Sequence, residues 1–509
     1  MISLFVPENG LSFLEVSELP KPAFFHDLNL DAYVEKFRED EYYSSIEPYF
    51  RYFPEKLSEA LYRQEIATDL CDPDIRASVN RFISGIGIAE RYLSYSEKVM
   101  SSVQKWKWRL DTIVQYYDAI ERFCFELNAN PPKSKAFYQL HQELSALLFV
   151  PETVKLRAKA QELNAGFEKL KFHITINKER ATLDFQYSED DYCAEIRTEF
   201  LNSVESGEQT FTESPFGDMN ISPLEEFILN QFMKQDRVLF RDLETFCGIK
   251  RDIIATDIVD LIRELRFYII NLDYFEKMKE RSFPICFPKL VSEKELYLDD
   301  CYDIVLASKN YEQKKEVVFN DVMKASSEKA IIVTGPNQGG KTTLARAFGQ
   351  SFYFGMMGLP VAAGTAKLPF VNRIFTQFAS TGGYGVEGRL EHELYGVKNM
   401  LDGMTKHSLV IFNELFTSAP TMDALTISRE LLARLIRMDA VCFVVTHTFE
   451  LAFDSDDYVS LVATVVEDGS FRRTYRIVRK SADGVAYANS IVSKYKLDYS
   501  HINYRLSKK

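Results

Sequence analysis

A stretch of small residues in the C-terminal half of the chain ends in a lysine and two threonines. Residues 335–342 read GPNQGGKT and fit the pattern GxxxxGK[ST]. They follow the apolar run 330–334 and open a stretch of helical character, a context that argues against a chance glycine-rich turn. Glycines leave converging backbone N–H groups uncovered, and the start of the helix adds the positive end of its dipole. The sequence therefore predicts a loop that binds the phosphates of a nucleotide.

Two side chains of this loop have distinct expected roles. We expect Lys341 to place its charge on the β- and γ-phosphates and Thr342 to offer its hydroxyl to Mg²⁺. The predicted cofactors are therefore ATP and Mg²⁺. The residues of the loop expected to bind them are Gly335, Pro336, Asn337, Gln338, Gly339, Gly340, Lys341, Thr342 and Thr343.

A second polar pair follows another apolar run. In SLVIFNELF, residues 408–416, four apolar residues lead to Asn413 and Glu414. At such a strand end an aspartate usually holds Mg²⁺ through its water shell, and the next glutamate polarises the attacking water. Asn413 carries no charge, so we expect it to bind Mg²⁺ weakly and partly through water, while Glu414 is the candidate catalytic base. Two outcomes stay open, slow ATP hydrolysis or ATP binding with little turnover.

A third apolar run, AVCFVVTH at residues 440–447, ends at Thr446 and His447. A polar residue at a third strand end is well placed to sense the γ-phosphate. We therefore assign His447 a catalytic role beside Glu414; the alternative is a core histidine without chemistry.

The elements that must carry these residues alternate in type. From residue 317 onward, short β-branched runs bounded by turns are separated by helical stretches. Such runs are typical of parallel strands that are buried on both faces. The C-terminal part is therefore predicted to be an α/β P-loop NTPase domain.

The first 300 residues are predicted to be mainly helical. Apolar residues between 99 and 127 follow a heptad spacing over about four repeats. We expect this helix to start near Gly87 and to end before Pro131, with a length of about 60 Å. It would serve as a lever or strut, or simply as a core seam. The seam positions are Val99, Val103, Trp106, Leu110, Ile113, Tyr117, Ile120, Cys124 and Leu127.

Other segments of the N-terminal part are less regular. A second helical run covers about 151–171, and alternating apolar residues in 172–187 predict a β-hairpin, with His173 a solvated residue on its polar side. Residues 203–222 are predicted to be a loop and 223–279 to be helical. Residues 295–308 look rich in strand, so we divide the chain into a helical core or lever region, 1–290, and an ATPase-type domain, 291–509.

Composition limits the class of protein. The chain has 509 residues, enough for two to four domains, with 46% hydrophobic and 27% charged residues. No apolar stretch is long enough to predict a transmembrane helix, and the N-terminus does not resemble a signal peptide. Seven cysteines without a CxxC pair fit a reducing, cytoplasmic setting. The net charge of −13 argues against tight non-specific DNA binding but leaves room for a local basic groove.

The three motifs together resemble those of the MutS family of ATPases, within the ABC-type class. The resemblance covers about 296–506 well and the helical part in outline. TGPNQGGKTTLAR is close to the family's TGPNMGGKSTxLR, VVTHTFELA to its TTHYxEL, and VVFNDV and IFTQFA to its flanking strands. NELFTSAPTMDALTIS resembles DEIGRGTSTxDGxxIA, which places Asp423 on the family's aspartate. ADGVAYANSIVSKYKL resembles the closing stretch, with Gly484 and Tyr487 in place.

The resemblance implies a homodimer in which each ATP lies between two subunits, with long lever helices that end in a clamp around DNA. A reduced clamp would correspond to the hairpin near 170–190. The partner would be DNA recognised by structure rather than by sequence, in a DNA repair or recombination role away from membranes. Asp423 would then belong to the nucleotide-binding residues, and Arg389 would reach the phosphate bound by the partner subunit.

The chain also departs from the family pattern. The mismatch-reading N-terminal domain and the connector domain are not found in the sequence, so direct mismatch recognition is not expected. The family signature GRSTFMVEM reads EGRLEHEL here, with Glu393 on the family's glutamate and no serine. Arg389 is the candidate substitute for that serine, since an arginine brings charge and several donors; a surface arginine is the alternative.

Three functions are compatible with these features. The first is a MutS-like ATPase whose ATP-driven dimerisation moves helical arms on DNA. The second is an ATP-binding switch or scaffold with little hydrolysis and protein partners, which Asn413 and the acidic balance favour. A transporter-type ATPase subunit is disfavoured, because nothing in the sequence looks membrane-facing.

Overall fold

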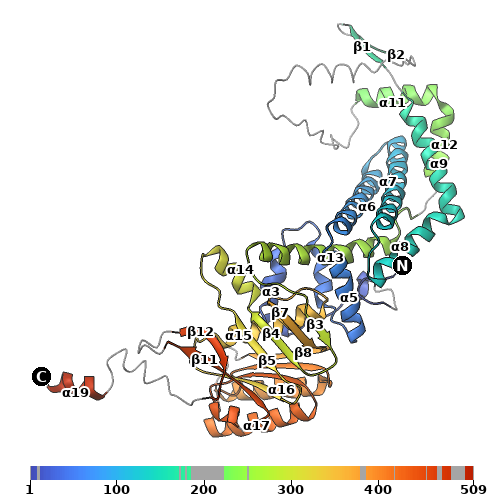
Figure 1. The fold of residues 1–509 in the computed structure, drawn as a ribbon. Helices are drawn as coiled ribbons and strands as arrows, with labels where there is room; N and C mark the ends of the chain where they lie inside the picture. The colour runs from blue at the N-terminus through green and yellow to red at the C-terminus, as the bar shows by residue number, and fades with distance from the viewer. Residues whose placement is uncertain are drawn as a thin grey trace. The chain divides into compact units, whose positions relative to one another are not determined.

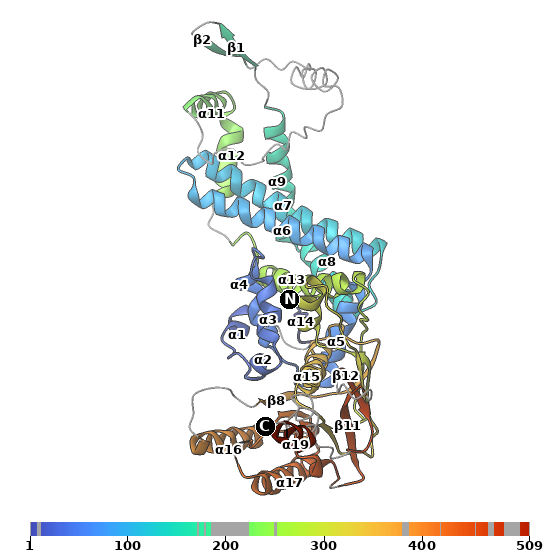
Figure 2. The same cartoon turned by 90° about the vertical axis from the view of Figure 1, so that its left-hand side faces the viewer.

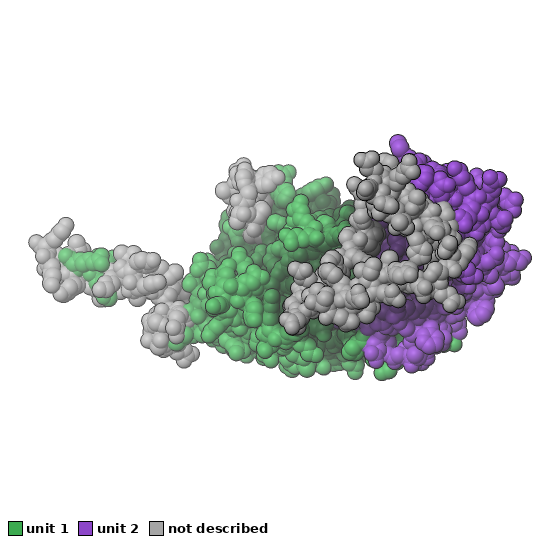
Figure 3. All heavy atoms as spheres, turned by 90° about the horizontal axis from the view of Figure 1, so that it is seen from above, with its two compact units in different colours: residues 1–73, 132–138, 263–509 green, residues 74–131, 139–262 purple. Residues whose placement is uncertain are grey.

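The computed structural model groups the chain into two compact units. Unit 1 comprises Met1–Pro73, Pro132–Tyr138 and Arg263–Lys509, and unit 2 comprises Asp74–Pro131 and Gln139–Ile262 (Figure 3). None of the helices in the described part is long and apolar enough to cross a membrane. The structure describes residues 2–7, 12–170, 173–177, 180–184, 223–248, 252–378, 386–417, 419–453, 455–466, 473–482 and 499–507.

Unit 2 is built on a pair of long helices, α6 and α7, which lie side by side in both views (Figure 1 and Figure 2). Gly85 makes their close approach possible, because a Cβ added there would lie 2.7 Å from Cβ of Ala119. Next to this contact the rings of Phe82 and Phe123 stack with centroids 4.5 Å apart. The helices that lie wholly or partly in this unit are α6 (Pro73–Lys98), α7 (Ser102–Ala129), α8 (Lys135–Phe149), α9 (Pro151–Glu168), α11 (Pro223–Gln235), α12 (Arg237–Cys247) and α13 (Thr256–Glu280). Helix α13 belongs to unit 1 from Arg263 onward.

The predicted start of the heptad helix near Gly87 is wrong. Helix α6 ends at Lys98, and α7 begins anew at Ser102 because the Ser101 hydroxyl accepts a hydrogen bond from the N–H of Gln104. The predicted end before Pro131 is confirmed by Ala129. With 28 residues, α7 is about 42 Å long, shorter than the expected length.

The heptad seam itself is confirmed except at Val99, which lies between the end of α6 and the start of α7 and so belongs to neither helix. Trp106 and Tyr117 are partly buried against the core of the unit. Tyr116 and Phe123 are buried as well, so the apolar stripe is wider than the seam of a two-stranded coiled coil. A lever role for this helix stays a prediction. The seam residues buried in α7 are Val103, Leu110, Ile113, Ile120, Cys124 and Leu127.

The predicted hairpin is confirmed by antiparallel pairing of β1 (His173–Asn177) with β2 (Arg180–Asp184). The side chain of His173 and the predicted loop 203–222 lie outside the described residues. The helical predictions for 151–171 and 223–279 are confirmed in outline by α9 and by α11, α12 and α13. A clamp role for the hairpin stays a prediction.

Unit 1 contains a six-stranded sheet in the order β12-β11-β6-β10-β9-β8. The three apolar runs predicted as parallel strands are β6, β10 and β9; they pair in parallel, and every residue in them is buried. β11 and β8 extend the parallel part, while β12 is antiparallel to β11. The strands are β6 (Ala330–Thr334), β8 (Arg373–Phe378), β9 (Ser408–Asn413), β10 (Val441–Val445), β11 (Tyr458–Val465) and β12 (Arg473–Arg479).

Helices cover both faces of this sheet. Alternation along β10 directs Phe443 toward α15, where its ring stacks on Phe348 at 4.5 Å, and directs Cys442 toward α17, where it packs with Leu435. The remaining elements of this C-terminal part are α15 (Lys341–Met356), α16 (Val386–Gly403), α17 (Thr421–Arg437), the 3-10 helix η3 (Phe449–Phe453) and α19 (Tyr499–Ser507).

A second sheet of unit 1 has the order β3-β7-β4-β5. The prediction that residues 295–308 are rich in strand is right only for its first half. The strand ends at Cys301, and the Asp303 carboxylate then accepts hydrogen bonds from the N–H groups of Val305 (3.0 Å) and Leu306 (3.1 Å), which starts a helix. These elements are β3 (Lys289–Val291), β4 (Leu296–Cys301), α14 (Ile304–Glu312), β5 (Asn320–Lys324) and β7 (Thr365–Pro369).

The N-terminal residues of unit 1 pack directly on helix α15. Arg346 donates from Nε to the carbonyl of Asp27 at 3.0 Å, and Gln350 donates to the carbonyl of Leu28 at 2.9 Å. The Thr376 hydroxyl on β8 donates to the Asp27 carboxylate at 2.7 Å. The N-terminal helices are α1 (Phe13–Ser17), α2 (Phe24–Asp27), α3 (Leu30–Val34), η1 (Glu35–Phe37), α4 (Tyr43–Ile46), η2 (Glu47–Arg51) and α5 (Leu57–Asp69).

Replacing Gly349 with valine should destabilise unit 1. A Cβ at this position of α15 would lie 2.8 Å from a methyl of Leu28 and 2.9 Å from Cδ1 of Ile411, so the N-terminal segment and the sheet leave no room for it. We expect a loss of about 1–3 kcal/mol in the free energy of unfolding, measured by urea titration. Gly388→Ala on α16 is the control, because nothing lies within 4 Å of the added Cβ. Equal stability of the two variants would contradict this packing.

Candidate nucleotide-binding site

The phosphate loop connects the end of β6 to the start of α15. Gly335 and Gly340 have φ angles of +122° and +94°, which side chains disfavour. A Cβ at Gly335 would also lie 2.9 Å from the backbone nitrogen of Ala463 on β11. The glycines of the motif are thus required by the backbone conformation and by the neighbouring strand. Arg473 supports the outer side of the loop by donating from Nε to the carbonyl of Asn337 at 2.7 Å.

Lys341 lies across its own loop. Its ammonium donates to the carbonyls of Gly335 at 2.8 Å and Pro336 at 3.1 Å, and its side chain is largely buried. Burial lowers the pKa of Lys341, and the charge of Glu414 opposes part of that effect. The two carbonyls hold the ammonium at the N-terminal end of α15, where a bound phosphate could replace them as its partner.

The two residues predicted to hold Mg²⁺ are in contact. The Thr342 hydroxyl donates to Oδ1 of Asn413 at 3.1 Å, which joins the start of α15 to the end of β9. Both groups present oxygens, the ligand type that Mg²⁺ prefers, although both oxygens are neutral. The pair therefore fits the ion in chemical type, but it lacks the negative charge of a carboxylate.

The predicted catalytic pair is also brought together. Nε2 of His447 lies 2.8 Å from Oε1 of Glu414. Glu414 has a left-handed backbone, with φ +60°, and its N–H donates to the carbonyl of Val445 at 2.9 Å, which fixes it beside the end of β10. The hydrogen bond from His447 is the main cause that lowers the pKa of Glu414; the charges of His447 and Lys341 act in the same direction against partial burial.

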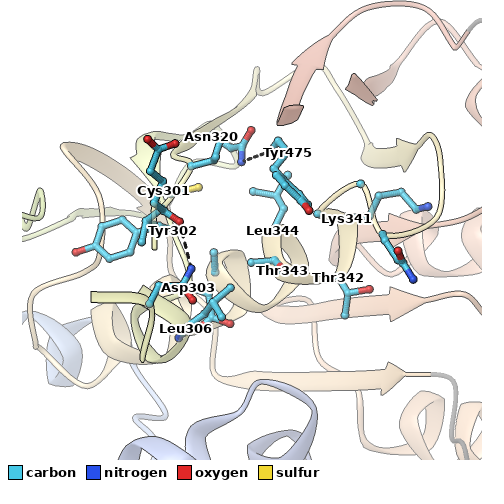
Figure 4. Close-up of a pocket in the computed structure, with 18 of the residues that line it drawn as sticks. Cys301, Tyr302, Asp303, Leu306, Asn320, Lys341, Thr342, Thr343, Leu344 and Tyr475 are labelled. Atoms are coloured by element: carbon cyan, nitrogen blue, oxygen red, sulfur yellow. Dashed lines mark hydrogen bonds between the residues drawn. The ribbon is translucent and has the colours of Figure 1, made fainter. Parts of the chain in front are cut away.

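A cavity of about 420 Å³ lies beside the loop. Lys341 and Thr342 lie at one end of it, and Tyr302 lies at the other (Figure 4). Between them stands Tyr475 of β12, whose carbonyl accepts a hydrogen bond from Nδ2 of Asn320 at 3.2 Å. The lining also includes Val317, and Glu414 borders the cavity.

This second end of the cavity was not predicted as part of the site. Tyr302 and Val317 lie in two different connecting segments, Tyr475 lies on β12, and the three residues share no motif. The only signal in the sequence was VVFNDV, residues 317–322, which was identified as an entry strand but not as a wall of the cavity. Of the predicted loop residues, Gln338, Gly339, Gly340 and Thr343 also line the cavity.

The remaining candidate nucleotide-binding residues, Arg389 and Asp423, lie on α16 and α17. Asp423 is exposed in the first turn of α17. Arg389 belongs to α16, but its side chain is outside the described part, as are Gly484 and Tyr487. Glu393 is buried, and its carboxylate accepts the N–H of Phe416 at 2.8 Å, so it anchors the chain just after Glu414.

The comparison with known families agrees with this geometry. The matched stretch begins on β6 and contains the phosphate loop, Asn413, Glu414 and His447. Residues 331–495 match the family model of MutS domain V, so this part of the chain is similar to the ATPase domain of MutS-family proteins.

Proposed function

We propose that the protein is a MutS-like ATPase that binds ATP and Mg²⁺ at an interface between two copies of the chain and hydrolyses ATP slowly. Hydrolysis would be coupled to movement of the helical region, 1–290, on DNA, in a repair or recombination role without direct mismatch reading. The observation that carries this proposal is the convergence of Lys341, Thr342 and Glu414 on one cavity, inside the stretch that matches MutS domain V.

Binding of the triphosphate follows from the loop. The N–H groups at the start of α15 and the bare backbone at Gly335 and Gly340 receive the phosphate oxygens. Lys341 exchanges its two carbonyl partners for phosphate, which gives the ammonium charge-assisted bonds in place of neutral ones. The rest of the nucleotide extends toward Tyr302 and Tyr475, two aromatic side chains among the described residues that line the cavity.

Hydrolysis depends on Glu414. Its carboxylate accepts a proton from the attacking water, and His447 fixes its orientation through the 2.8 Å contact. A general base is most effective when its pKa lies near the working pH. The lowered pKa of Glu414 keeps it ionised but makes it a weak base, which favours slow turnover.

Mg²⁺ would be held by the Thr342 hydroxyl and, partly through water, by Asn413. When bound, the ion neutralises charge on the β- and γ-phosphates. Because Asn413 is neutral, the protein's own residues add little to the affinity for the ion, and Lys341 provides most of the positive charge at this end of the cavity.

The proposed dimer would cover exposed apolar side chains around the site. MutS-family proteins act as dimers on DNA. In this chain, large apolar residues are exposed on α16, which carries Glu393, on α17, which carries Asp423, and on η3, which follows His447 in the sequence. They are Leu394 and Tyr395 on α16, Met422 on α17, and Phe449 and Phe453 on η3. A second copy seated on them would remove these side chains from water.

The alternative is an ATP-binding switch or scaffold with little hydrolysis and protein partners. It is favoured by the neutral Asn413 and by the net charge of −13. ATP turnover measured with single-stranded, duplex and junction DNA separates the two. Negligible hydrolysis that no DNA changes, together with no DNA binding at low salt, would exclude the first function and leave the switch.

Replacing Asn413 with aspartate should strengthen the Mg²⁺ dependence of nucleotide binding. The new carboxylate still accepts the hydroxyl of Thr342 and adds a negative charge beside the ion. We expect about a tenfold gain in Mg²⁺ affinity of the nucleotide complex, measured by calorimetric titration of ATP at stepped Mg²⁺ concentrations. Asn413→Ala is the matched control and should show no gain. An unchanged Mg²⁺ dependence in the aspartate variant would place the metal elsewhere.

A further inference from the structure

Three aromatic rings gather on one side of the α6–α7 pair in unit 2. Trp108 of α7 lies 5.1 Å from the ring of Tyr92 and 5.4 Å from that of Tyr95, both on α6. All three side chains are partly exposed. They lie outside the buried seam of α7, which passes through Leu110 and Ile113. The three rings therefore form a half-buried group outside the buried seam.

Cationic side chains flank these rings along both helices. Arg91 and Lys98 stand four residues before and three residues after Tyr95, and Lys105 stands three residues before Trp108. Residues three or four apart share one face of a helix. All three cationic residues are exposed. The aromatic group is thus bordered by positive charge at both ends.

Carboxylates near this surface offset its charge only in part. Burial raises the pKa of Tyr92 and the charge of Asp111 acts in the same direction, but Asp111 also forms an ion pair with Lys107. Glu97 adjoins Lys98 in the sequence, two residues after Tyr95, and so points to a different side of α6. Glu90 directly precedes Arg91, so the positive charge of this surface is assigned mainly to the exposed Lys98 and Lys105.

We propose that this surface binds single-stranded nucleic acid. We call it the aromatic–basic face, formed by Tyr92, Tyr95, Trp108, Arg91, Lys98 and Lys105. Unstacked bases rest on the rings, and the cations follow the phosphates. A duplex fits less well because its bases are already stacked on each other. The inference rests on the DNA partner of the proposed function and names the surface and the form of nucleic acid.

The two tryptophans of the chain give this surface its own optical signal. Trp106 packs against the hydrophobic clusters that contain Leu110 and Phe240, whereas Trp108 belongs to the aromatic–basic face. The Trp106→Phe protein therefore reports on the face alone, and the Trp108→Phe protein reports on the core. Addition of a thirty-residue oligothymidylate should quench the emission of the first protein and leave the second unchanged.

Affinity measurements test whether the rings stack on bases. Tyr95→Ala combined with Trp108→Ala should weaken binding of oligothymidylate about tenfold, and Tyr95→Phe with Trp108→Phe should retain it. An abasic oligomer with the same number of phosphates should bind both variants equally. Lys98→Ala with Lys105→Ala should weaken both ligands and reduce the slope of log K against log salt by about 1.4. Circular dichroism establishes that each variant is folded.

The outcomes separate this inference from the proposed function. Base stacking on this face is overturned, while a DNA partner stands, by either of two results. In the first, the Tyr95→Ala, Trp108→Ala protein binds oligothymidylate with the same affinity as the wild type. In the second, it loses as much affinity for the abasic oligomer as for oligothymidylate. Tighter binding of a duplex than of the single strand overturns it as well. Failure of the wild type to bind any nucleic acid at low salt, with ATP binding intact, overturns the DNA partner itself.

Discussion

Replacing Glu414 with glutamine should lower ATP turnover by about 10²–10⁴-fold and leave ATP affinity close to that of the wild type. The amide keeps the size of the side chain and can still contact His447, but it cannot accept the proton of the attacking water. Single-turnover measurement of phosphate release, together with calorimetric ATP binding, separates the two effects. Because the pKa of Glu414 is lowered, its carboxylate stays ionised near neutral pH. Wild-type turnover should therefore be constant near neutral pH and fall only on the acid side, as the carboxylate becomes protonated.

Glu293→Gln is the matched control for this experiment. Glu293 is exposed, does not line the cavity and undergoes the same change of charge. Its turnover should equal that of the wild type. Rapid hydrolysis by the Glu414→Gln protein would show that Glu414 is not the catalytic base. Glu414 would then have a structural role only.

The parts of the site that the sequence predicted are those that local geometry determines. The phosphate loop is contiguous, and its glycines are required by the φ angles at 335 and 340. Asn413, Glu414 and His447 follow apolar runs, and neighbouring parallel strands bring their carboxyl ends to one edge of the sheet. These residues could be placed together without knowledge of distant contacts.

The parts that were not predicted depend on contacts between distant segments. Tyr302 and Tyr475 are far apart in sequence, and nothing in either neighbourhood marks them as walls of one cavity. The packing of Asp27 against Thr376 and Arg346 joins the N-terminus to the sheet edge in the same way. The two local errors concern capping. Ser101 and Asp303 begin helices inside stretches whose apolar patterns favoured a continuous helix and a strand.

Replacing Lys341 with alanine should weaken ATP binding at least about a hundredfold. The ammonium is largely buried and has carbonyl partners in its own loop, so its charge is held where the β- and γ-phosphates would enter. Hydrogen bonds to charged groups contribute roughly 1.5–3 kcal/mol each, and the alanine variant would lose the bonds of the ammonium to both the β- and the γ-phosphate. Isothermal calorimetry with ATP and Mg²⁺ measures the change directly.

Lys329→Ala provides the matched control, because Lys329 is exposed and stands at the opposite end of β6 from the loop. Both variants lose one positive charge, so a general effect of net charge on the anion ATP would weaken them equally. A loss of ATP affinity in the Lys341→Ala protein alone would instead require that the ammonium of Lys341 contacts the phosphates. Thermal unfolding without nucleotide shows whether removing the ammonium from the carbonyls of Gly335 and Pro336 disturbs the loop. If the folded Lys341→Ala protein binds ATP as tightly as the Lys329→Ala protein, the phosphates do not lie in this loop, and the ATPase and dimer proposals lose their physical basis.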